Sequence, residues 1–102
     1  MNNPLMAVVD DLRDRMLKAR EEQGYQEELS SIATFNDNAG VEHGADMQKE
    51  YWTGRAEGLR DAMEDYGGKS TFLQFAVSEA HERGAKRARE YAAAQGMTLR
   101  PS

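Results

Sequence analysis

The residues best suited to chemistry lie in a short turn, Gly67-Gly68-Lys69-Ser70-Thr71. The two glycines bend freely, Lys69 supplies an ammonium group, and Ser70 or Thr71 supplies a hydroxyl that can cap a following helix. Backbone N–H groups at the start of a helix, together with the helix dipole, favour an anion at such a place. The turn therefore predicts a phosphate site at Lys69, Ser70 and Thr71, with an ordinary capped turn as the alternative interpretation.

Aromatic and basic side chains elsewhere would complete a nucleotide site. Tyr66 precedes the turn and Trp52 lies on the same predicted helix, and nucleic-acid bases stack on such rings at about 1–3 kcal/mol each. Tyr51 and Trp52 are about 100° apart around a helix, so only one of them can face the core. Arg83 and Arg87 lie one helical turn apart and could clamp a phosphate or carboxylate. The alternative interpretations are that Trp52 lines an interface between subunits and that the two arginines pair with nearby acids.

Catalytic chemistry has little support in the sequence. His43 and His81 have no ligand partner at a recognised zinc spacing, and the chain has no cysteine. The lysine turn is not a Walker A loop, because Met63 stands where that motif needs a glycine. We therefore expect a binding protein that is not an enzyme, with no cofactor and no metal site.

The first element that must position these residues is a helix near the N-terminus. Asn3 followed by Pro4 is typical of an N-cap and a first helical residue. Apolar residues at steps of three and four predict a helix over about 4–22. Gly24 weakens the pattern, so an extension of this helix to about 33 is left open.

Two further helices follow a predicted loop. Turn-forming residues indicate that loop over about 36–44. Apolar periodicity predicts a second helix over about 45–66 and a third over about 71–94. Thr71 with Gln74 forms a capping box for the third helix, and Gly96 is placed to stop it.

Small residues recur every four positions on the second and third predicted helices. The two rows are Gly54, Gly58 and Ala62, and Ala76, Ala80, Gly84, Ala88 and Ala92. Such rows allow another backbone to approach closely. We therefore predict an all-α fold over residues 1–102, a single three-helix domain. In this fold, the second and third helices form a closely packed antiparallel hairpin that the first helix crosses.

The composition predicts a thin core and an oligomer. Leu, Ile, Val and Phe together supply 15 of the 102 residues, whereas alanine alone supplies 14. Small proteins with so little apolar volume often bury more of it between subunits. We therefore expect a homo-oligomer.

Charge and hydropathy narrow the choice of partners. Residues 1–50 hold 11 acids and 5 bases, and residues 51–102 hold 7 acids and 8 bases, which gives −6 and +1. Duplex DNA is an unlikely match for this balance, because DNA affinity comes mainly from Lys and Arg on phosphates. No long apolar run or basic leader is present. We expect a cytoplasmic protein that binds neither membrane nor duplex DNA.

Residues 51–62 resemble the second helix of many small helical proteins encoded by bacteriophages. This stretch reads Tyr51-Trp52-Thr53-Gly54-Arg55-Ala56-Glu57-Gly58-Leu59-Arg60-Asp61-Ala62. Phage accessory proteins of this size often counter host defence, either as oligomeric sponges for cyclic nucleotide signals or as inhibitors bound to a nuclease complex. The resemblance implies one of these two roles and transfers no site residue.

The predicted function joins the resemblance to the candidate residues. We expect a homo-oligomeric sponge, located in the host cytoplasm, that sequesters a phosphate-bearing small ligand such as a cyclic nucleotide. Lys69, Ser70 and Thr71 would contact phosphate, and Tyr66 or Trp52 would stack on a base. The alternative is an acidic protein that inhibits a host nuclease or a CRISPR-type defence complex by binding its basic surface.

Overall fold

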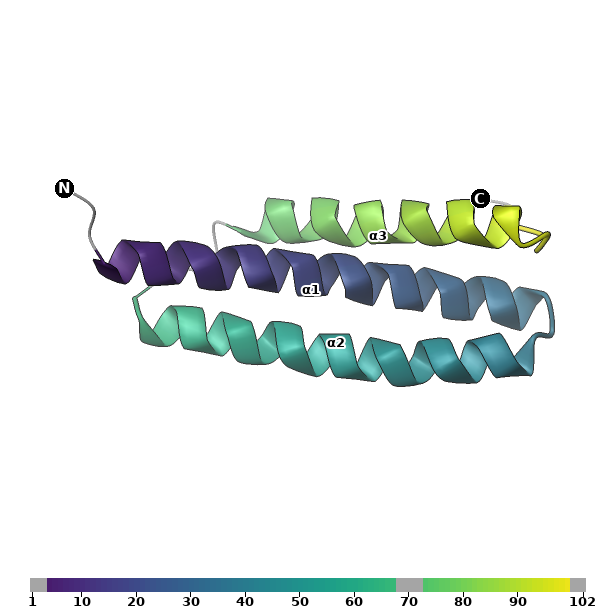
Figure 1. Ribbon diagram of the computed structural model, residues 1–102, viewed down its shortest axis with the longest axis horizontal. Coiled ribbons are helices and arrows are strands. Elements are labelled where there is room, and N and C mark those ends of the chain that lie inside the picture. The colour runs from purple at the N-terminus through teal and green to yellow at the C-terminus, as the bar shows by residue number, and fades with distance from the viewer. Residues whose placement is uncertain (1–3, 68–72, 100–102) are drawn as a thin grey trace.

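The computed structural model describes residues 4–67 and 73–99, and these residues form three α-helices. α1 spans Pro4–Phe35, α2 spans Ala39–Asp65 and α3 spans Gln74–Ala94. No strand occurs within the two described ranges. The predicted all-α, three-helix fold is confirmed, and the helices form a rod of 53 × 21 × 19 Å (Figure 1).

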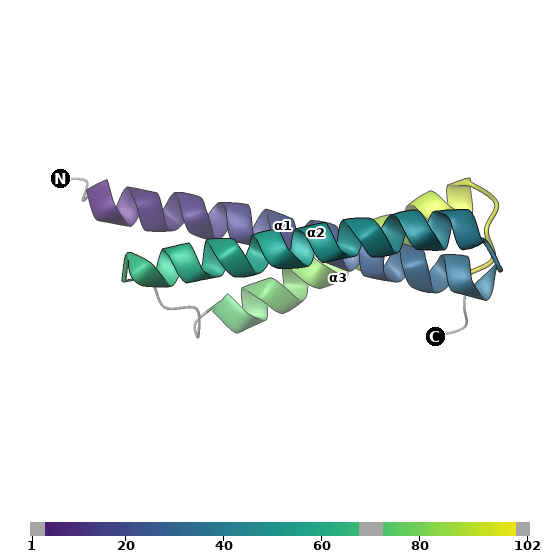
Figure 2. The same cartoon turned by 90° about the horizontal axis from the view of Figure 1, so that it is seen from below.

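α1 lies at the centre of the arrangement and packs along both other helices (Figure 1). α2 runs antiparallel to α1, and α3 runs parallel to α1. Figure 2 shows α3 crossing the other two helices at an angle. Across the described residues, the backbones of α2 and α3 stay apart, although Ala45 of α2 and Ala88 of α3 share one hydrophobic cluster with Leu29 of α1. The first helix therefore packs on both others as expected, but the predicted direct packing of the second helix on the third is wrong.

Glycine explains why α3 packs on α1. Gly84 of α3 is buried, and a Cβ added there would overlap the carbonyl group of Glu21 and lie 2.7 Å from the amide nitrogen of Tyr25. Gly24 of α1 is buried in the same way against the backbone of His81. Each helix thus presents a glycine to the backbone of the other, which allows α1 and α3 to approach closely. No glycine of α2 lies against the backbone of another helix in this way.

α1 continues through Gly24 as one helix to Phe35. The extension that the sequence left open is therefore present and ends two residues beyond the predicted limit at 33. Glycine costs a helix about 1 kcal/mol relative to alanine. Close packing of α3 on Gly24 offsets this cost. The local sequence around Gly24 does not reveal this packing.

The connection between α1 and α2 is shorter than the predicted loop over 36–44. α2 begins at Ala39, and the Asn38 side chain caps it by accepting a hydrogen bond from the amide of Val41 at 3.2 Å. The loop prediction is wrong for residues 39–44. Because a good N-cap sets the start of the helix, the turn-forming residues that follow are accommodated in its first turns.

α3 ends at Ala94, as predicted, and Gly96 follows with a positive φ of 81°. The segment beyond it returns to the α1–α2 connection, where the Asn36 side chain donates to the carbonyl of Thr98 and accepts from its amide, at 2.8 and 2.9 Å. These two hydrogen bonds tie the chain after α3 to the far end of α1.

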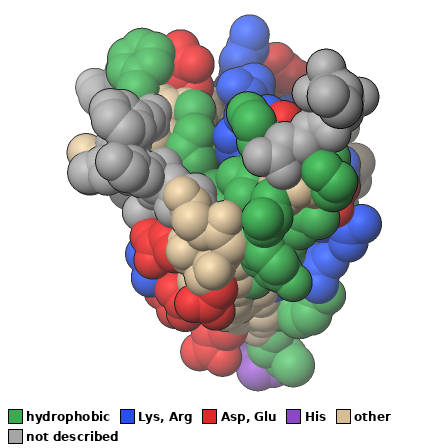
Figure 3. Space-filling view, turned by 90° about the vertical axis from the view of Figure 1, so that its left-hand side faces the viewer, with side chains coloured by type: hydrophobic (Ala, Val, Ile, Leu, Met, Phe, Trp, Pro, Cys, Tyr) green, Lys and Arg blue, Asp and Glu red, His purple; other side chains and the backbone are tan. Residues whose placement is uncertain are grey.

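The core consists mainly of alanine, as the composition predicts. Eight of the twelve buried hydrophobic residues among those described are alanine. The largest fully buried side chains are Met16, Ile32 and Met63. Large apolar side chains stay exposed instead, and several gather at the end of the rod where α1 begins (Figure 3). Phe75 at the start of α3 is 76% exposed. One copy of the chain therefore leaves much of its apolar surface in contact with water.

Candidate functional site

The predicted phosphate turn lies only partly within the described structure. Lys69, Ser70 and Thr71 fall outside the described residues, so their role stays a prediction. Tyr66 caps the C-terminal end of α2 and is half exposed. Trp52 is partly buried and packs edge-on against Tyr51, with ring centroids 5.0 Å apart. The expectation that only one of these two adjacent aromatic residues faces inward is confirmed, because Tyr51 is exposed.

The two predicted arginines on α3 differ in their surroundings. Arg87 lies against α1, where its Nη1 is 3.1 Å from a carboxylate oxygen of Glu22 and 3.6 Å from one of Glu21. Its guanidinium also lies 5.1 Å from the centre of the Tyr25 ring. The hydrogen bond to Glu22 is the main cause that raises the pKa of Arg87. Arg83 is exposed one turn earlier.

The structure does not gather the described candidates into one place. Arg83 and Arg87 belong to α3, whereas Trp52 and Tyr66 belong to α2, and α1 separates these helices. The alternative interpretation of the sequence was that Arg87 pairs with acids on its own helix. The acids that pair with it come from α1 instead. Arg87 therefore already has two anionic partners and a ring beneath it.

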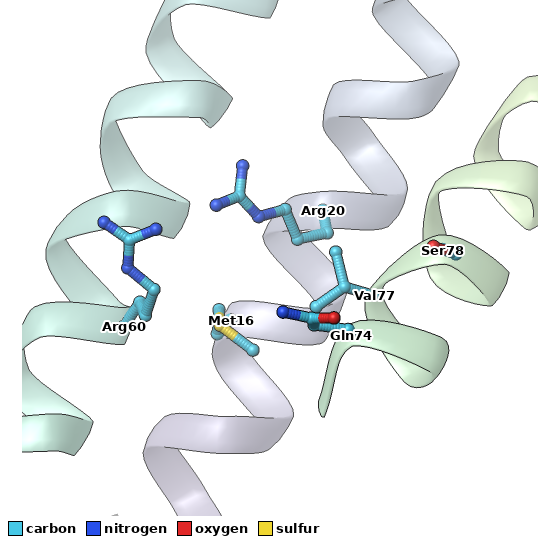
Figure 4. A pocket seen from close by; sticks show the side chains of 6 residues that line it. All are labelled: Met16, Arg20, Arg60, Gln74, Val77 and Ser78. Atoms are coloured by element: carbon cyan, nitrogen blue, oxygen red, sulfur yellow. The ribbon is translucent and has the colours of Figure 1, made fainter. Parts of the chain in front are cut away.

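A different site lies where all three helices meet. A hollow of about 410 Å³ is lined by side chains from each helix (Figure 4). The lining residues are Met16 and Arg20 of α1, Arg60 of α2, and Gln74, Val77 and Ser78 of α3. The hollow lies between α2 and α3, over the α1 residues Met16 and Arg20 (Figure 4).

Arg20 is the most informative residue of the pocket. Its Nη1 donates to the side-chain oxygen of Gln23 at 2.8 Å, but its Nε is buried and has no hydrogen-bond partner. Buried polar atoms in native proteins are nearly always hydrogen-bonded, to protein, water or a ligand. No carboxylate of the described residues forms an ion pair with Arg20. An oxyanion in the hollow would give this guanidinium the charged partner that it lacks.

Arg60 brings a second guanidinium to the same place. Figure 4 shows it extending from α2 toward the side where the guanidinium of Arg20 lies. Its ion pair with the neighbouring Asp61 is long, at 3.6 Å, and largely exposed. Exposed pairs of this kind contribute about 0–1 kcal/mol, so Asp61 competes only weakly for this cation.

A second, smaller hollow of about 330 Å³ continues from the pocket along the α1–α3 seam. It shares Arg20, Val77 and Ser78 with the first hollow and ends at His81. His81 forms a short contact with the carboxylate of Glu27, which holds its imidazole against α1. Arg20 lines both hollows, and Arg60 lines the larger one.

Sequence reasoning missed both of these arginines. For Arg20 a signal exists, because no acid stands three or four positions away in a chain that holds 18 acids. A helical arginine without such a neighbour is free for a tertiary partner. For Arg60 no comparable signal exists, since Glu57 and Glu64 stand at those positions.

The described residues form neither a metal cluster nor a membrane-spanning helix. In residues 4–67 and 73–99, no group of three His, Asp or Glu side chains is arranged to hold a metal ion. None of the described helices combines the length and apolar character needed to cross a bilayer.

The pocket combines charged and apolar residues. Two cations, a buried nitrogen without an acceptor and a partly apolar wall favour an anionic small molecule. No protein-family model, no curated protein and no solved structure matches this chain.

Proposed function

We propose that this protein binds a phosphate-bearing small ligand without transforming it, and that the pocket of Arg20 and Arg60 holds the anionic group. The observation that carries the proposal is that Arg20 and Arg60 line one hollow, and that the guanidinium of Arg20 has a buried Nε without an acceptor. Guanidinium groups bind phosphate oxygens through paired, charge-assisted hydrogen bonds.

The remaining walls suit the rest of such a ligand. Gln74 and Ser78 offer donors and acceptors, and Met16 and Val77 offer apolar surface. Ligand pockets in proteins have volumes of about 300–1,000 Å³, so this hollow lies near the lower end. It suits one phosphate with the sugar or base beside it, rather than a whole cyclic trinucleotide.

Binding alone is sufficient for sequestration. The resemblance to phage accessory proteins is our reason to propose that the ligand is a host defence signal, such as a cyclic nucleotide, and that the protein lowers its free concentration. Lys69, Ser70 and Thr71 remain candidates for further phosphate contacts. In this proposal Arg87 has a structural role, because it already forms ion pairs with Glu21 and Glu22.

Ligand binding to the whole chain tests the proposal. Native mass spectrometry and calorimetry would be run with inorganic phosphate, pyrophosphate, mononucleotides, and cyclic di- and trinucleotides. We expect one panel member to bind stoichiometrically. Arg20→Gln and Arg60→Gln should each weaken it at least about tenfold, because a hydrogen bond to a charged group contributes about 1.5–3 kcal/mol. Arg55→Gln, an exposed change on α2 outside the pocket, is the matched control.

The variants separate the possible sites. If Lys69→Ala abolishes binding and the two pocket variants do not, the ligand binds at the turn and the pocket assignment is wrong. If the protein binds no panel member, the acidic-inhibitor alternative gains weight. Its association with a basic host protein should then weaken steeply as salt is raised.

A further inference from the structure

The outward face of α2 carries a regular stripe that the fold leaves uncovered. At alternating steps of three and four it presents Gly44, Met47, Tyr51, Gly54, Gly58 and Asp61, all exposed. A Cβ added at Gly44, Gly54 or Gly58 would meet nothing within 4 Å. Met47 and Tyr51 are 59% and 56% exposed, although both are large. The spacing keeps these positions on one side of the helix, as at the seam of two packed helices, although only Met47 and Tyr51 supply the apolar side chains that a coiled-coil seam has.

The stripe is complementary to itself when it is read in the opposite direction. An antiparallel copy places Met47 opposite Gly58 of the second copy and Tyr51 opposite Gly54 of the second copy. Each large side chain then faces a glycine, and two-fold symmetry repeats both contacts. We propose that a second copy of this chain docks antiparallel on this face of α2.

One charge contact, at the ends of the seam, favours the antiparallel direction. Asp65, one turn beyond the stripe, would lie near Gly40 in the first turn of the second copy's α2. A helix N-terminus has N–H groups without partners inside the helix and carries a partial positive charge, so it favours a carboxylate. A parallel pair in register would instead place Asp61 and Asp65 against their own copies and would stack Tyr51 on Tyr51.

The structure already shows that glycines on a helix surface allow another helix to pack closely on it. Gly84 of α3 and Gly24 of α1 allow two backbones to approach closely, and each glycine lies against the main chain of the other helix. Gly54 and Gly58 have the same freedom from a side chain but nothing packed on them. The alanine-rich core adds a reason for association, because one copy buries few large apolar side chains.

The expected dimer is weak. From Gly40 to Asp65 the seam would extend about 37 Å, and a helix about 10 Å wide would bury roughly 400 Å² per copy. Standard interfaces bury about 800 Å² per partner. Glu50 and Glu57 would also face each other along one flank, so added salt should strengthen the association by screening them. We expect a dissociation constant of about micromolar or higher.

The lack of cysteine makes the test direct. Met47→Cys protein with a mass tag would be mixed with untagged Gly58→Cys protein and oxidised. We expect the mixed disulfide to form at least about tenfold faster than a disulfide within either variant alone, because the bond needs Cβ atoms within about 4.5 Å. Ala93→Cys, an exposed change on α3, controls for random collision.

Several results would overturn the proposal. Gly58→Cys joining to itself as fast as the mixed pair would indicate a parallel seam, and equally fast reaction of Ala93→Cys would indicate no specific seam. Sedimentation provides the second measurement: Gly58→Arg should remove the dimer while circular dichroism stays unchanged, since the position is open. A chain that is monomeric at every concentration, or a dimer that keeps its affinity in Gly58→Arg, would contradict the inference.

Discussion

Two rows of small residues with the same four-residue spacing have opposite environments in this protein. On α3, Ala80, Gly84 and Ala88 are fully buried against α1. On α2, Gly54 and Gly58 are exposed, and their missing side chains leave open space. Their common spacing was the reason to expect the two rows to pack on each other. In the structure the α3 row packs on α1 instead, and the glycines of the α2 row face open space.

The difference teaches that a small-residue row specifies a close approach but not the partner. Gly84 of the α3 row lies against the main chain of α1 at Glu21 and Tyr25, beside Gly24, a glycine that belongs to no repeated row. At this crossing each helix presents a glycine to the main chain of the other. No described helix of the same copy covers Gly54 and Gly58 of the α2 row, and we propose that large side chains of a second copy do.

The largest expected effect comes from filling the buried glycine. Gly84→Ala would place a methyl group inside the backbone of α1 at Glu21 and Tyr25. Because main chain cannot move aside as a side chain can, we expect a loss of about 3 kcal/mol in the free energy of unfolding, measured by urea denaturation. A loss below about 1 kcal/mol would show that α3 can pack on α1 without this close contact.

Filling the exposed glycine should have a smaller effect of the opposite sign. Gly58→Ala meets no atom within 4 Å, and alanine is the better helix former. We expect the free energy of unfolding to rise by about 0.5–1 kcal/mol at protein concentrations too low for dimers. A destabilised Gly58→Ala variant would mean that the row on α2 is covered within one copy, and the comparison would fail.

The smallest expected effect is the pH dependence of stability that arises from Tyr25 of α1, where α3 packs on α1. Burial, with Tyr91 as a lesser cause, raises the pKa of Tyr25 above its ordinary value, against a lowering by Arg87. In the unfolded chain the phenol loses its proton near pH 10, whereas the folded chain retains it. Unfolding then releases a proton, so this contribution to stability is fully present below about pH 10 and declines as pH rises above it.

Tyr25→Phe isolates that contribution. Urea denaturation of both proteins between about pH 8 and 11 should show a shallower decline for the variant, because phenylalanine has no proton to release. Identical slopes for the two proteins would indicate that Tyr25 has the same pKa in the folded and unfolded chains.

Much of the fold was predictable from the sequence. Three helices, the end of α3 near Gly96 and the alanine-rich core all follow from local signals, because capping and periodicity act over one or two turns. The errors came where packing outweighs local preference. The sequence pattern indicates that Gly24 weakens the first helix, but in the structure Gly24 is where the backbone of α3 packs on α1. Residues 39–44 were predicted as loop but belong to α2.

The candidate site was less predictable. Arg20 and Arg60 are forty positions apart, and only the antiparallel pairing of α1 with α2 places them beside one hollow. Arg87 lies one turn from Arg83 and reads as half of a clamp. Its acids, Glu21 and Glu22, come from another helix, where no spacing within α3 could reveal them.

The sequence by itself determined that the chain is helical, where α1 begins, where α2 and α3 end, and that its core is thin. These properties depend on each residue's own preferences and on neighbours within about four positions. Only the tertiary structure decided that α1 would be the central helix, which row of small residues would be buried, and that two distant arginines would share a pocket. Those outcomes depend on which surfaces fit together, and a fit between surfaces is a property of pairs of helices, not of any one segment.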